Sequence, residues 1–395
     1  MNDKRIIFHI DVNNAFLSWT AIKLLEEGYK KDIRTIPSVI GGDESKRHGI
    51  VLAKSPVAKK YGIKTAETLY SARKKCRNLL VFPSSFEFYN KKSRELFDYL
   101  SKISPNIEIF SIDECFLDMS NTSYLYSDLL KLAYKIKWDI KQKFGYTVNI
   151  GIANNKLCAK MASDFEKPDK VHTLYKEEVE KKMWQLDVSE LFMIGKKTTE
   201  KLKNININTI KDLANADIEL LKKNFKNQAI IMKDYANGND DSEVISCFDN
   251  NKCISTSETF EVDVIDEERL KKTLLYQSQV VCRELRKQKL YAQTIAVTIK
   301  TYDFKSYSKQ KKLNNVTDST NEVYENIVEV FNALWDRTKI RNIGVRISNF
   351  CDTRKKQISF FDKVDDEKSI DYILDNIKYK YGDDCINIAS LINKN

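Results

Sequence analysis

The sequence predicts a multidomain α+β protein, and three observations support this prediction. At 395 residues the chain is too long for one ordinary core, so two to four domains are expected. Up to about residue 174, apolar strands are bracketed by helices, which is typical of an α+β layer. After a helical stretch, residues 253–350 follow the order strand, helix, strand, strand, helix, strand, which is typical of a ferredoxin-like unit.

The chain begins with an apolar strand at residues 5–12 that ends in an acid, Asp11. A helix follows from residue 13 towards Gly28, and a small insertion comes after the helix. The elements predicted for this insertion are strands at 33–40, 50–53 and 79–82 and helices at 57–61 and 68–76, with Pro56 in the first turn of the earlier helix.

The net charge of +10 is concentrated in one segment. Residues 46–92 carry twelve Lys or Arg and only two acids, so the charges in the rest of the chain balance. A basic segment beside an acidic site suits a polyanionic substrate, because electrostatic attraction raises the local concentration of that substrate. The alternative is a lysine-rich surface that is only solvated.

Two adjacent acids stand at a predicted hairpin turn. Residues 107–118 are apolar on both faces and predict two strands that meet at a tight turn near Ser111 to Glu114. Asp113 and Glu114 repel each other if both ionise, and burying them without a counter-charge is costly. A divalent metal resolves this conflict, because hard cations prefer carboxylate oxygens. With Asp11 as a third strand-end carboxylate, the pattern predicts a site for two Mg²⁺ ions and in-line phosphoryl transfer, although either motif alone is more often a solvated acid.

The middle of the chain alternates helices and strands before it becomes wholly helical. Helices are predicted at 86–104, 123–143 and 156–165, and strands at 147–153 and 171–174. Within 176–238, Ile194 and Gly195 form a short turn between two helices, followed by Lys196. The free N–H groups of that helix start can hold a DNA phosphate without reading its sequence, although such turns are common. The polar residues 239–252 predict a linker.

The C-terminal unit contains an alternating strand and a basic loop. Its predicted elements are strands at 255–262, 291–302, 313–316 and 340–348 and helices at 266–288 and 320–338. The polar face of the strand that carries Lys300 can lie along a phosphate backbone, and the loop from Lys305 to Lys312 adds positive charge beside it.

The tail after residue 352 carries two adjacent aromatic residues, Phe360 and Phe361, shortly after Gln357 and Ile358. Aromatic residues outside a folded domain suit an anchor that inserts into a pocket of another protein. The alternative is that they pack against a helix predicted at 367–380.

Several classes of protein are excluded by composition. The chain has no apolar stretch of 18 residues and no signal-peptide pattern, so neither a membrane span nor an export signal is predicted. The eight cysteines are scattered without a Cys-x-x-Cys pair, and there are only three histidines. A structural zinc site is therefore not expected, and reduced thiols in the cytoplasm are the natural interpretation.

Taken together, these motifs resemble those of the Y-family of translesion DNA polymerases, and most closely its bacterial DNA polymerase IV branch, over about residues 5–361. The motifs that carry the resemblance are Asp11-Val12, Ser111 to Glu114, Asn155-Lys156-x-x-Ala159-Lys160-Met161-Ala162-Ser163-Asp164 followed by Lys167-Pro168, the Ile194-Gly195 hairpin, Ile343-Gly344-Val345-Arg346 and the clamp-type Gln357 to Phe361. The resemblance implies a right-hand polymerase whose parts are palm 1–14 and 83–174, fingers 15–82, a helical thumb with a helix-hairpin-helix at 175–240, linker 241–252, little finger 253–350 and tail 351–395.

The resemblance also implies an activity and a set of roles. The expected enzyme is a monomer that adds dNTPs to a primer 3′-OH on a DNA template, with low fidelity and in DNA damage tolerance. Asp11, Asp113 and Glu114 are the implied catalytic residues and would bind two Mg²⁺ ions together with the Val12 carbonyl. The implied nucleotide-binding residues are Asn14, Ala15, Phe16, Ala53, Lys59 and Lys167, with Phe16 as the steric gate against a ribose 2′-OH. The implied DNA contacts are Ile194, Gly195, Lys196, Lys300 and Lys305, and the implied contacts with the sliding clamp (its beta subunit) are Gln357, Ile358, Phe360 and Phe361.

The sequence departs from the family pattern at two places. Ala53, Pro56 and Lys59 stand where many members carry a hydroxyl, a tyrosine and an arginine, and a lysine offers a point charge in place of a bidentate fork. Met193 replaces a usual glycine in the hairpin turn. Three alternatives stay open: a metal-dependent nuclease that uses the same acids, a catalytically weak DNA- and clamp-binding accessory, and a mutagenesis-polymerase subunit that needs partner proteins.

Overall fold

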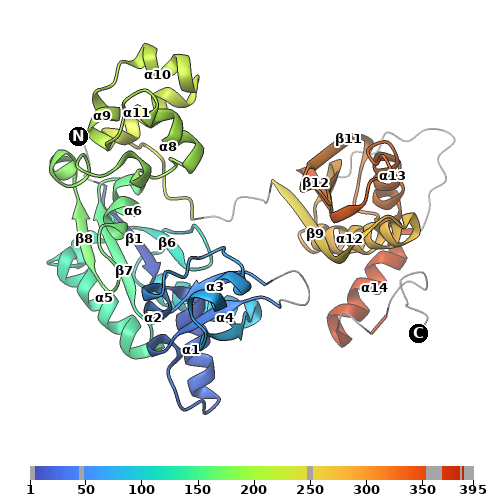
Figure 1. The fold of residues 1–395 in the computed structure, drawn as a ribbon, viewed down its shortest axis with the longest axis horizontal. Helices are drawn as coiled ribbons and strands as arrows, with labels where there is room; N and C mark the ends of the chain where they lie inside the picture. The colour runs from blue at the N-terminus through green and yellow to red at the C-terminus, as the bar shows by residue number, and fades with distance from the viewer. Residues whose placement is uncertain (1–4, 44–48, 247–251, 353–366, 383–384, 387–395) are drawn as a thin grey trace. The chain divides into compact units, whose positions relative to one another are not determined.

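The N-terminal strand β1 (Ile7–Val12) is the central strand of a five-stranded sheet (Figure 1). The computed structural model describes residues 5–43, 49–246, 252–352, 367–382 and 385–386, and its contacts divide the chain into two units near residue 250. In the first unit the strand order is β5-β6-β1-β7-β8. The other strands are β5 (Ile107–Ile109), β6 (Glu114–Asp118), β7 (Val148–Ala153) and β8 (Val171–Leu174).

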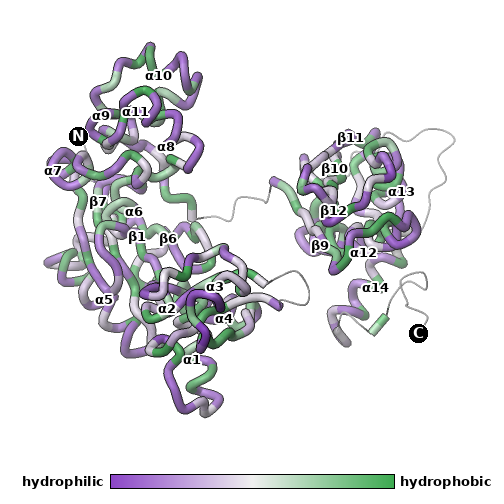
Figure 2. Tube along the Cα trace, viewed as in Figure 1, coloured by the Kyte–Doolittle hydropathy of each residue, from purple (hydrophilic) through white to green (hydrophobic). Residues whose placement is uncertain are grey.

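Helices cover both faces of this sheet because β1 is buried on both sides. Phe8 and Ile10 pack into a core with residues of α4 (Phe86–Leu100) and α5 (Leu129–Phe144). Ile7 points to the other face and packs with α6 (Lys156–Asp164). Successive side chains of a strand alternate between faces, so His9 and Asp11 lie on the α6 side. Hydrophobic and hydrophilic residues alternate along α5, as expected for a helix that covers a sheet (Figure 2).

The acidic hairpin forms as predicted, but the helix predicted at 123–143 begins later. A single 3₁₀ turn occupies Ser123–Leu125, and α5 starts at Leu129. The side chain of Asp128 accepts hydrogen bonds from the backbone N–H groups of Leu130 and Lys131. This cap satisfies the first free N–H donors of the helix, so it sets the position at which the helix starts. The prediction from apolar spacing alone placed that start too early.

The basic insertion folds around a small sheet of order β3-β2-β4. Its elements are β2 (Ser38–Gly41), β3 (Val51–Lys54), α2 (Pro56–Lys60), α3 (Leu69–Lys75) and β4 (Leu80–Pro83), and α1 (Ala15–Glu26) connects β1 to it. Pro56 opens α2 as predicted. The strand predicted at 33–40 is wrong over its first half, because Asp32 caps a 3₁₀ turn at Ile33–Thr35 before β2 begins.

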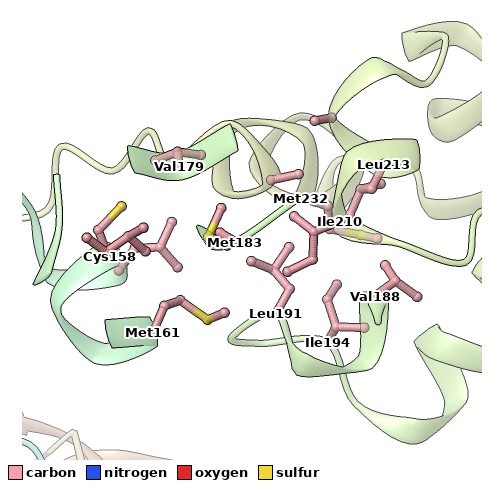
Figure 3. Close-up of a cluster of buried hydrophobic side chains, with 14 of the residues drawn as sticks. Cys158, Met161, Val179, Met183, Val188, Leu191, Ile194, Ile210, Leu213 and Met232 are labelled. Atoms are coloured by element: carbon pink, nitrogen blue, oxygen red, sulfur yellow. The ribbon is translucent and has the colours of Figure 1, made fainter. Parts of the chain in front are cut away.

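Residues 176–238 are helical, as predicted. The helices are α7 (Val179–Lys182), α8 (Lys196–Lys203), α9 (Ile210–Asn215), α10 (Ile218–Phe225) and α11 (Gln228–Ala236). They share one apolar core with α6, in which Met161 points towards Leu191 and Ile194 (Figure 3). This shared core ties the helical segment to the sheet that carries the acids.

The second unit has the predicted order β9 (Cys253–Val264), α12 (Glu267–Lys287), β10 (Tyr291–Thr301), β11 (Ser306–Thr317), α13 (Thr320–Asn332) and β12 (Ile340–Cys351). The sheet order is β11-β10-β12-β9, and every pairing is antiparallel. Because β9 and β10 both run antiparallel to β12, they run parallel to each other and form a split β-α-β unit.

The basic loop predicted from Lys305 to Lys312 is wrong, because β11 starts at Ser306. Residues 306–312 pair with β10 along its length, and the chain turns between Thr301 and Lys305, whose carbonyl accepts a 2.9 Å hydrogen bond from the Thr301 N–H. The segment looks like a loop because its side chains are polar on both faces. An edge strand tolerates this pattern, and its lysines discourage pairing with another chain.

A further helix, α14 (Glu367–Tyr381), confirms the helix predicted at 367–380 and docks on the second unit through a buried arginine. The Arg286 side chain is 4% exposed and donates from Nε to Asp375 Oδ2 at 2.6 Å and from Nη1 to the Asp318 carbonyl at 2.7 Å. Asp371 accepts a 2.9 Å hydrogen bond from the Thr320 N–H. These charge-assisted contacts join α14 to α12 and to the start of α13.

The helices in the described part of the chain include none with the length and hydrophobicity of a membrane span.

Candidate active site

The structure brings the three predicted carboxylates together at the adjoining ends of β1 and β6. Asp11 pairs with Glu114 across the two strands, and the Val12 N–H donates a 3.0 Å hydrogen bond to the Asp113 carbonyl. Asp113 is held in the turn by the Ser111 hydroxyl, which donates to its Oδ1 at 2.7 Å. The site is therefore assembled from two segments about 100 residues apart in sequence, as the strand-end pattern predicted.

Two lysines supply counter-charges to these acids. The Lys167 ammonium contacts the Asp11 carboxylate and lies 2.7 Å from Asp164. The Lys160 ammonium contacts Glu114 and lies 5.1 Å from the centre of the Phe110 ring. The family resemblance implies a nucleotide-binding role for Lys167, whereas no role was predicted for Lys160. Lys160 lies one helical turn after Lys156 on α6, and its contact with β6 exists only in the folded chain.

His9 is a residue of the site that sequence reasoning missed. Its ring is fully buried, with Nε2 3.2 Å from Glu114 Oε2 and Nδ1 2.8 Å from the Ser163 hydroxyl. Burial lowers the pKa of His9 below its usual value, so the ring is neutral near pH 7. The available signal was a polar residue inside an apolar strand, two positions before Asp11 and therefore on the same face.

Burial and nearby charge act in opposite directions on the acids. Burial disfavours ionisation of Glu114, but hydrogen bonds from His9 and Lys160 outweigh it and lower the pKa of Glu114 to about 2. Burial raises the pKa of Asp11, and the Lys167 ammonium acts against that rise without cancelling it. Asp11 therefore remains short of positive charge in a site that holds three carboxylates.

Phe16 is the second residue of α1, five residues after Asp11, and it lies in a cluster of aromatic rings. It stacks on Tyr89 of α4 with the ring centres 5.0 Å apart, and Phe86 lies edge-on at 5.8 Å. Tyr89 is itself fixed, because its hydroxyl lies 2.7 Å from the Thr20 hydroxyl. The half-buried Phe16 ring is thus supported from behind by α4.

The other predicted nucleotide-binding residues differ in their exposure. Asn14 is exposed, adopts a left-handed backbone (φ 51°) and donates from Nδ2 to the Lys54 carbonyl at 2.8 Å, which ties the start of α1 to β3. Ala15 is 4% exposed and Ala53 is 6% exposed, packed with core residues such as Leu17. Lys59 is exposed on α2. The Ala53 methyl therefore belongs to a core, whereas Asn14 and Lys59 present polar groups to solvent.

The helix turn at Ile194 and Gly195 is formed as predicted. Gly195 is the N-cap of α8, no atom lies within 4 Å of the position of a Cβ there, and Lys196 is exposed. Ile194 is 9% exposed and belongs to the shared core. Met193 has a left-handed backbone (φ 73°), a conformation that glycine adopts without strain. This conformation accounts for the usual glycine at that place in the family pattern.

Lys300 and Lys305 lie in the second unit, which is described separately from the carboxylates. Lys300 is on β10 opposite Ser306 and Asn342, and the exposed Lys305 pairs with Asp303 at 2.8 Å. The predicted clamp-binding residues, Gln357, Ile358, Phe360 and Phe361, lie outside the described residues.

The donor set of this site fits hard divalent cations. Three carboxylates at neighbouring strand ends supply oxygen ligands, and Asp11 is largely buried, so a cation beside it would favour its ionised form. In the described part of the chain, no group of three His, Cys, Asp or Glu side chains is already arranged around one point. The ammonium groups of Lys160 and Lys167 lie against two of the carboxylates instead.

Comparison with protein families gives three matches along the chain. Residues 10–164 match the impB/mucB/samB family, residues 176–207 match the IMS family HHH motif, and residues 251–360 match the impB/mucB/samB family C-terminal domain. The first match covers the carboxylates and Phe16, and the second covers the Gly195 turn. The helix α14 lies beyond the third match.

Curated relatives and a solved structure agree with these matches. The chain is 46% identical to a DNA polymerase IV of Clostridium acetobutylicum over 392 residues, which is 99% of each chain. It is 33% identical to a DNA polymerase IV of Acetivibrio thermocellus, over 96% of this chain and 95% of that one. A solved structure, the Y-family DNA polymerase chimera Dbh-Dpo4(243-245)-Dbh, shares the fold with a TM-score of 0.75 and 23% identity, over 88% of this chain and 100% of the chimera.

Proposed function

This chain belongs to the impB/mucB/samB family of Y-family DNA polymerases, and from that premise we propose how its residues carry out DNA synthesis. It is a DNA-directed DNA polymerase of the translesion type, and its substrates are primer-template DNA and dNTPs. Polymerases of this family depend on metal ions. The observation that carries the proposed mechanism is the meeting of Asp11, Asp113 and Glu114 at adjoining strand ends.

In the proposed reaction the primer 3′-OH gives up its proton to solvent and its oxygen attacks the α-phosphorus of a dNTP. A P–O bond forms to the primer, the bond between the α-phosphorus and the oxygen that bridges it to the β-phosphate breaks, and pyrophosphate leaves. Held by Asp11, Asp113, Glu114 and the Val12 carbonyl, two Mg²⁺ ions would activate the attacking oxygen and neutralise charge on the leaving group. Lys167, which pairs with Asp11, can turn to the triphosphate. The N–H groups at the start of α1, at Ala15 and Phe16, can hold further phosphate oxygens.

The proposed mechanism is tested by primer extension with the purified protein. With primer-template DNA, all four dNTPs and Mg²⁺, we expect distributive extension of the primer. Chelation of Mg²⁺ by EDTA should stop extension, and excess Mg²⁺ should restore it, because the carboxylates cannot polarise the reacting oxygens by themselves. Reactions without dNTPs serve as the control.

Two results would contradict the polymerase mechanism. Shortening of the DNA in the reaction without dNTPs would favour the nuclease alternative. Binding of primer-template without extension would favour the accessory role or a subunit that needs partner proteins, and would direct attention to Pro56 and Lys59.

We propose that Phe16 excludes ribonucleotides, because its ring is held rigidly by Tyr89 and Phe86. Phe16→Ala is expected to raise the efficiency of rNTP incorporation relative to dNTP by roughly 10- to 200-fold, the range for a change of pocket shape in an apolar site. The measurement is kcat/KM for dCTP and rCTP opposite a template G. Leu25→Ala, a change to an exposed side chain on the same helix, is the matched control. Unchanged sugar selection in Phe16→Ala would remove Phe16 as the gate.

The domain division is also a proposal. We assign the palm to 1–14 and 83–174, the fingers to 15–82, the thumb to 175–240, a linker to 241–252, the little finger to 253–350 and the tail to 351–395. The separate sheets of the insertion and of the second unit support the fingers and little-finger assignments. Ile194, Gly195 and Lys196 would contact DNA phosphates from the thumb, and Lys300 and Lys305 from the little finger.

Four further properties rest on the sequence and the family. We propose that Gln357, Ile358, Phe360 and Phe361 bind the beta subunit of a sliding clamp, that the enzyme acts as a monomer, and that it works in the cytoplasm. Low fidelity is proposed because no second acidic cluster with the pattern of a proofreading exonuclease stands out in the sequence.

A further inference from the structure

His9 is a fully buried polar side chain directly beneath Glu114, and the mechanism proposed above does not use it. Its ring lies 4.7 Å from the ring of Phe116 and has no contact with solvent. An apolar residue would fill this position at lower cost, because burying a polar group is unfavourable unless it is hydrogen-bonded. The partners of His9 therefore decide what the residue does.

The imidazole links α6 to the carboxylate site. Nδ1 lies 2.8 Å from the hydroxyl of Ser163 on α6, and Nε2 lies 3.2 Å from Glu114 Oε2 on β6. This bridge is possible because Gly151, opposite His9 on β7, has no side chain and lets α6 approach closely. Among the described residues, Nε2 forms no hydrogen bond of good geometry, so its 3.2 Å ion-pair contact with Glu114 Oε2 is the polar contact on which its role depends.

The geometry favours one tautomer of the neutral ring. If Nδ1 carried the proton, the lone pair of Nε2 would face a carboxylate oxygen 3.2 Å away, and the two would repel. With the proton on Nε2, the ring donates towards Glu114 and Nδ1 accepts from the Ser163 hydroxyl. That hydroxyl has one proton, which it donates to the Lys160 carbonyl at 2.7 Å, so it donates to Nδ1 only when it gives up that bond. The repulsion at Glu114 is what favours this exchange.

We infer that His9 is a positioning residue that holds Glu114 in the orientation of a metal ligand, with Ser163 anchoring the ring at Nδ1. This inference rests on the proposed metal site. Lys160 and His9 both contact the same oxygen, Oε2, which leaves Oε1 of Glu114 to face a bound cation. Lys160 can be displaced by the cation it competes with, whereas the buried His9 cannot move away. Partners of this kind orient ligands in many metal sites.

Three substitutions of His9 distinguish the effect of its hydrogen-bond donor to Glu114 from the effect of its buried volume. The amide nitrogen of His9→Gln can occupy the place of Nε2 and donate to Glu114. The shorter His9→Asn reaches only Ser163, and His9→Leu keeps apolar volume without either contact. We expect His9→Gln to bind Mn²⁺ within about threefold of the wild-type affinity, and His9→Asn and His9→Leu to bind it about 10- to 100-fold more weakly.

The readout is Mn²⁺ affinity of the full chain, measured by electron paramagnetic resonance without DNA or nucleotide. Primer-extension kinetics then serve as a second readout, in which the Mg²⁺ concentration needed for half-maximal rate should shift in the same order. His172→Gln on β8 is the matched control, because it changes a histidine that contacts Phe165 and none of the carboxylates. Thermal unfolding of each variant checks that the fold is kept, and His9→Asn carries the test if His9→Leu does not fold.

The outcomes separate this inference from the proposed function. Equal Mn²⁺ affinity in the wild type, His9→Asn and His9→Leu would overturn the positioning role while leaving the polymerase intact. A loss in His9→Gln as large as that in His9→Leu would also overturn it, because shape and not donation would then be decisive. The graded order in a protein that extends no primer would support the positioning role and contradict the proposed mechanism.

Discussion

Asp113→Asn and Glu114→Gln are each expected to lower kcat for primer extension by about 10³-fold. Each variant keeps the volume of the side chain and removes one negative charge from the site that the proposed mechanism uses to hold cations. Stabilisation of transition-state charge by such cations contributes several kcal/mol, and about 4 kcal/mol corresponds to this loss of rate. Single-turnover extension with saturating dNTP measures the effect on the chemical step.

Binding of primer-template DNA by these variants is expected to stay within a few-fold of the wild type, because phosphate contacts by basic groups carry most of that affinity. Asp118→Asn is the matched control. It lies at the other end of the same strand and caps a local turn by accepting from the Ser120 N–H at 2.9 Å. Extension at the wild-type rate by Asp113→Asn would contradict the assignment of the carboxylates and favour an accessory role.

Gly151→Ala is expected to destabilise the first unit by more than about 3 kcal/mol. A Cβ at Gly151 would lie 1.9 Å from the Ala159 carbonyl oxygen and 2.6 Å from the Ser163 nitrogen. Both are backbone atoms of α6, so no rotation of a side chain can relieve the clash, and the helix must move away from β7. Overpacking of a core costs 1–3 kcal/mol in milder cases. Chemical denaturation with hydrogen exchange of β7 and α6 peptides measures the loss.

The displacement of α6 from β7 would also alter the active site. Movement of α6 withdraws Ser163 from His9 and Lys160 from Glu114, so extension is expected to fall even where the protein stays folded. Gly195→Ala is the control for stability, because no atom lies within 4 Å of its added Cβ and its backbone φ is −83°. Equal stability of Gly151→Ala and the wild type would mean that α6 does not pack as closely as the structure indicates.

Much of the fold follows from local patterns in the chain. The strand at 171–174 agrees with the structure residue by residue, and the helix predicted at 57–61 is found one residue earlier with Pro56 in its first turn, because apolar runs and a first-turn proline act within a few residues. Three predictions failed, for two reasons. Side-chain caps at Asp128 and Asp32 set the start of α5 and replace the first half of the strand predicted at 33–40 by a 3₁₀ turn. The residues of β11 are polar on both faces, and only the pairing with β10 identifies them as a strand.

The predicted carboxylates and the missed residues of the site differ in how far along the chain the signal for each extends. Asp11, Asp113 and Glu114 were found because acids at the ends of apolar strands are visible in a short window of sequence. The pairing of Lys160 with Glu114 spans 46 residues, and that of His9 with Ser163 spans 154. No periodicity links residues so far apart, so these contacts could not be predicted from spacing.

By itself the sequence determined the apolar strands around the acids, the acidic turn and the basic insertion, because each depends on the physical chemistry of neighbours along the chain. The tertiary structure alone decided that Gly151 lets α6 approach the sheet, that His9 and Lys160 therefore reach Glu114, and that Arg286 holds α14 against the second unit. The physical reason is that burial and charge pairing depend on which surfaces meet in space, and those surfaces come from distant parts of the chain.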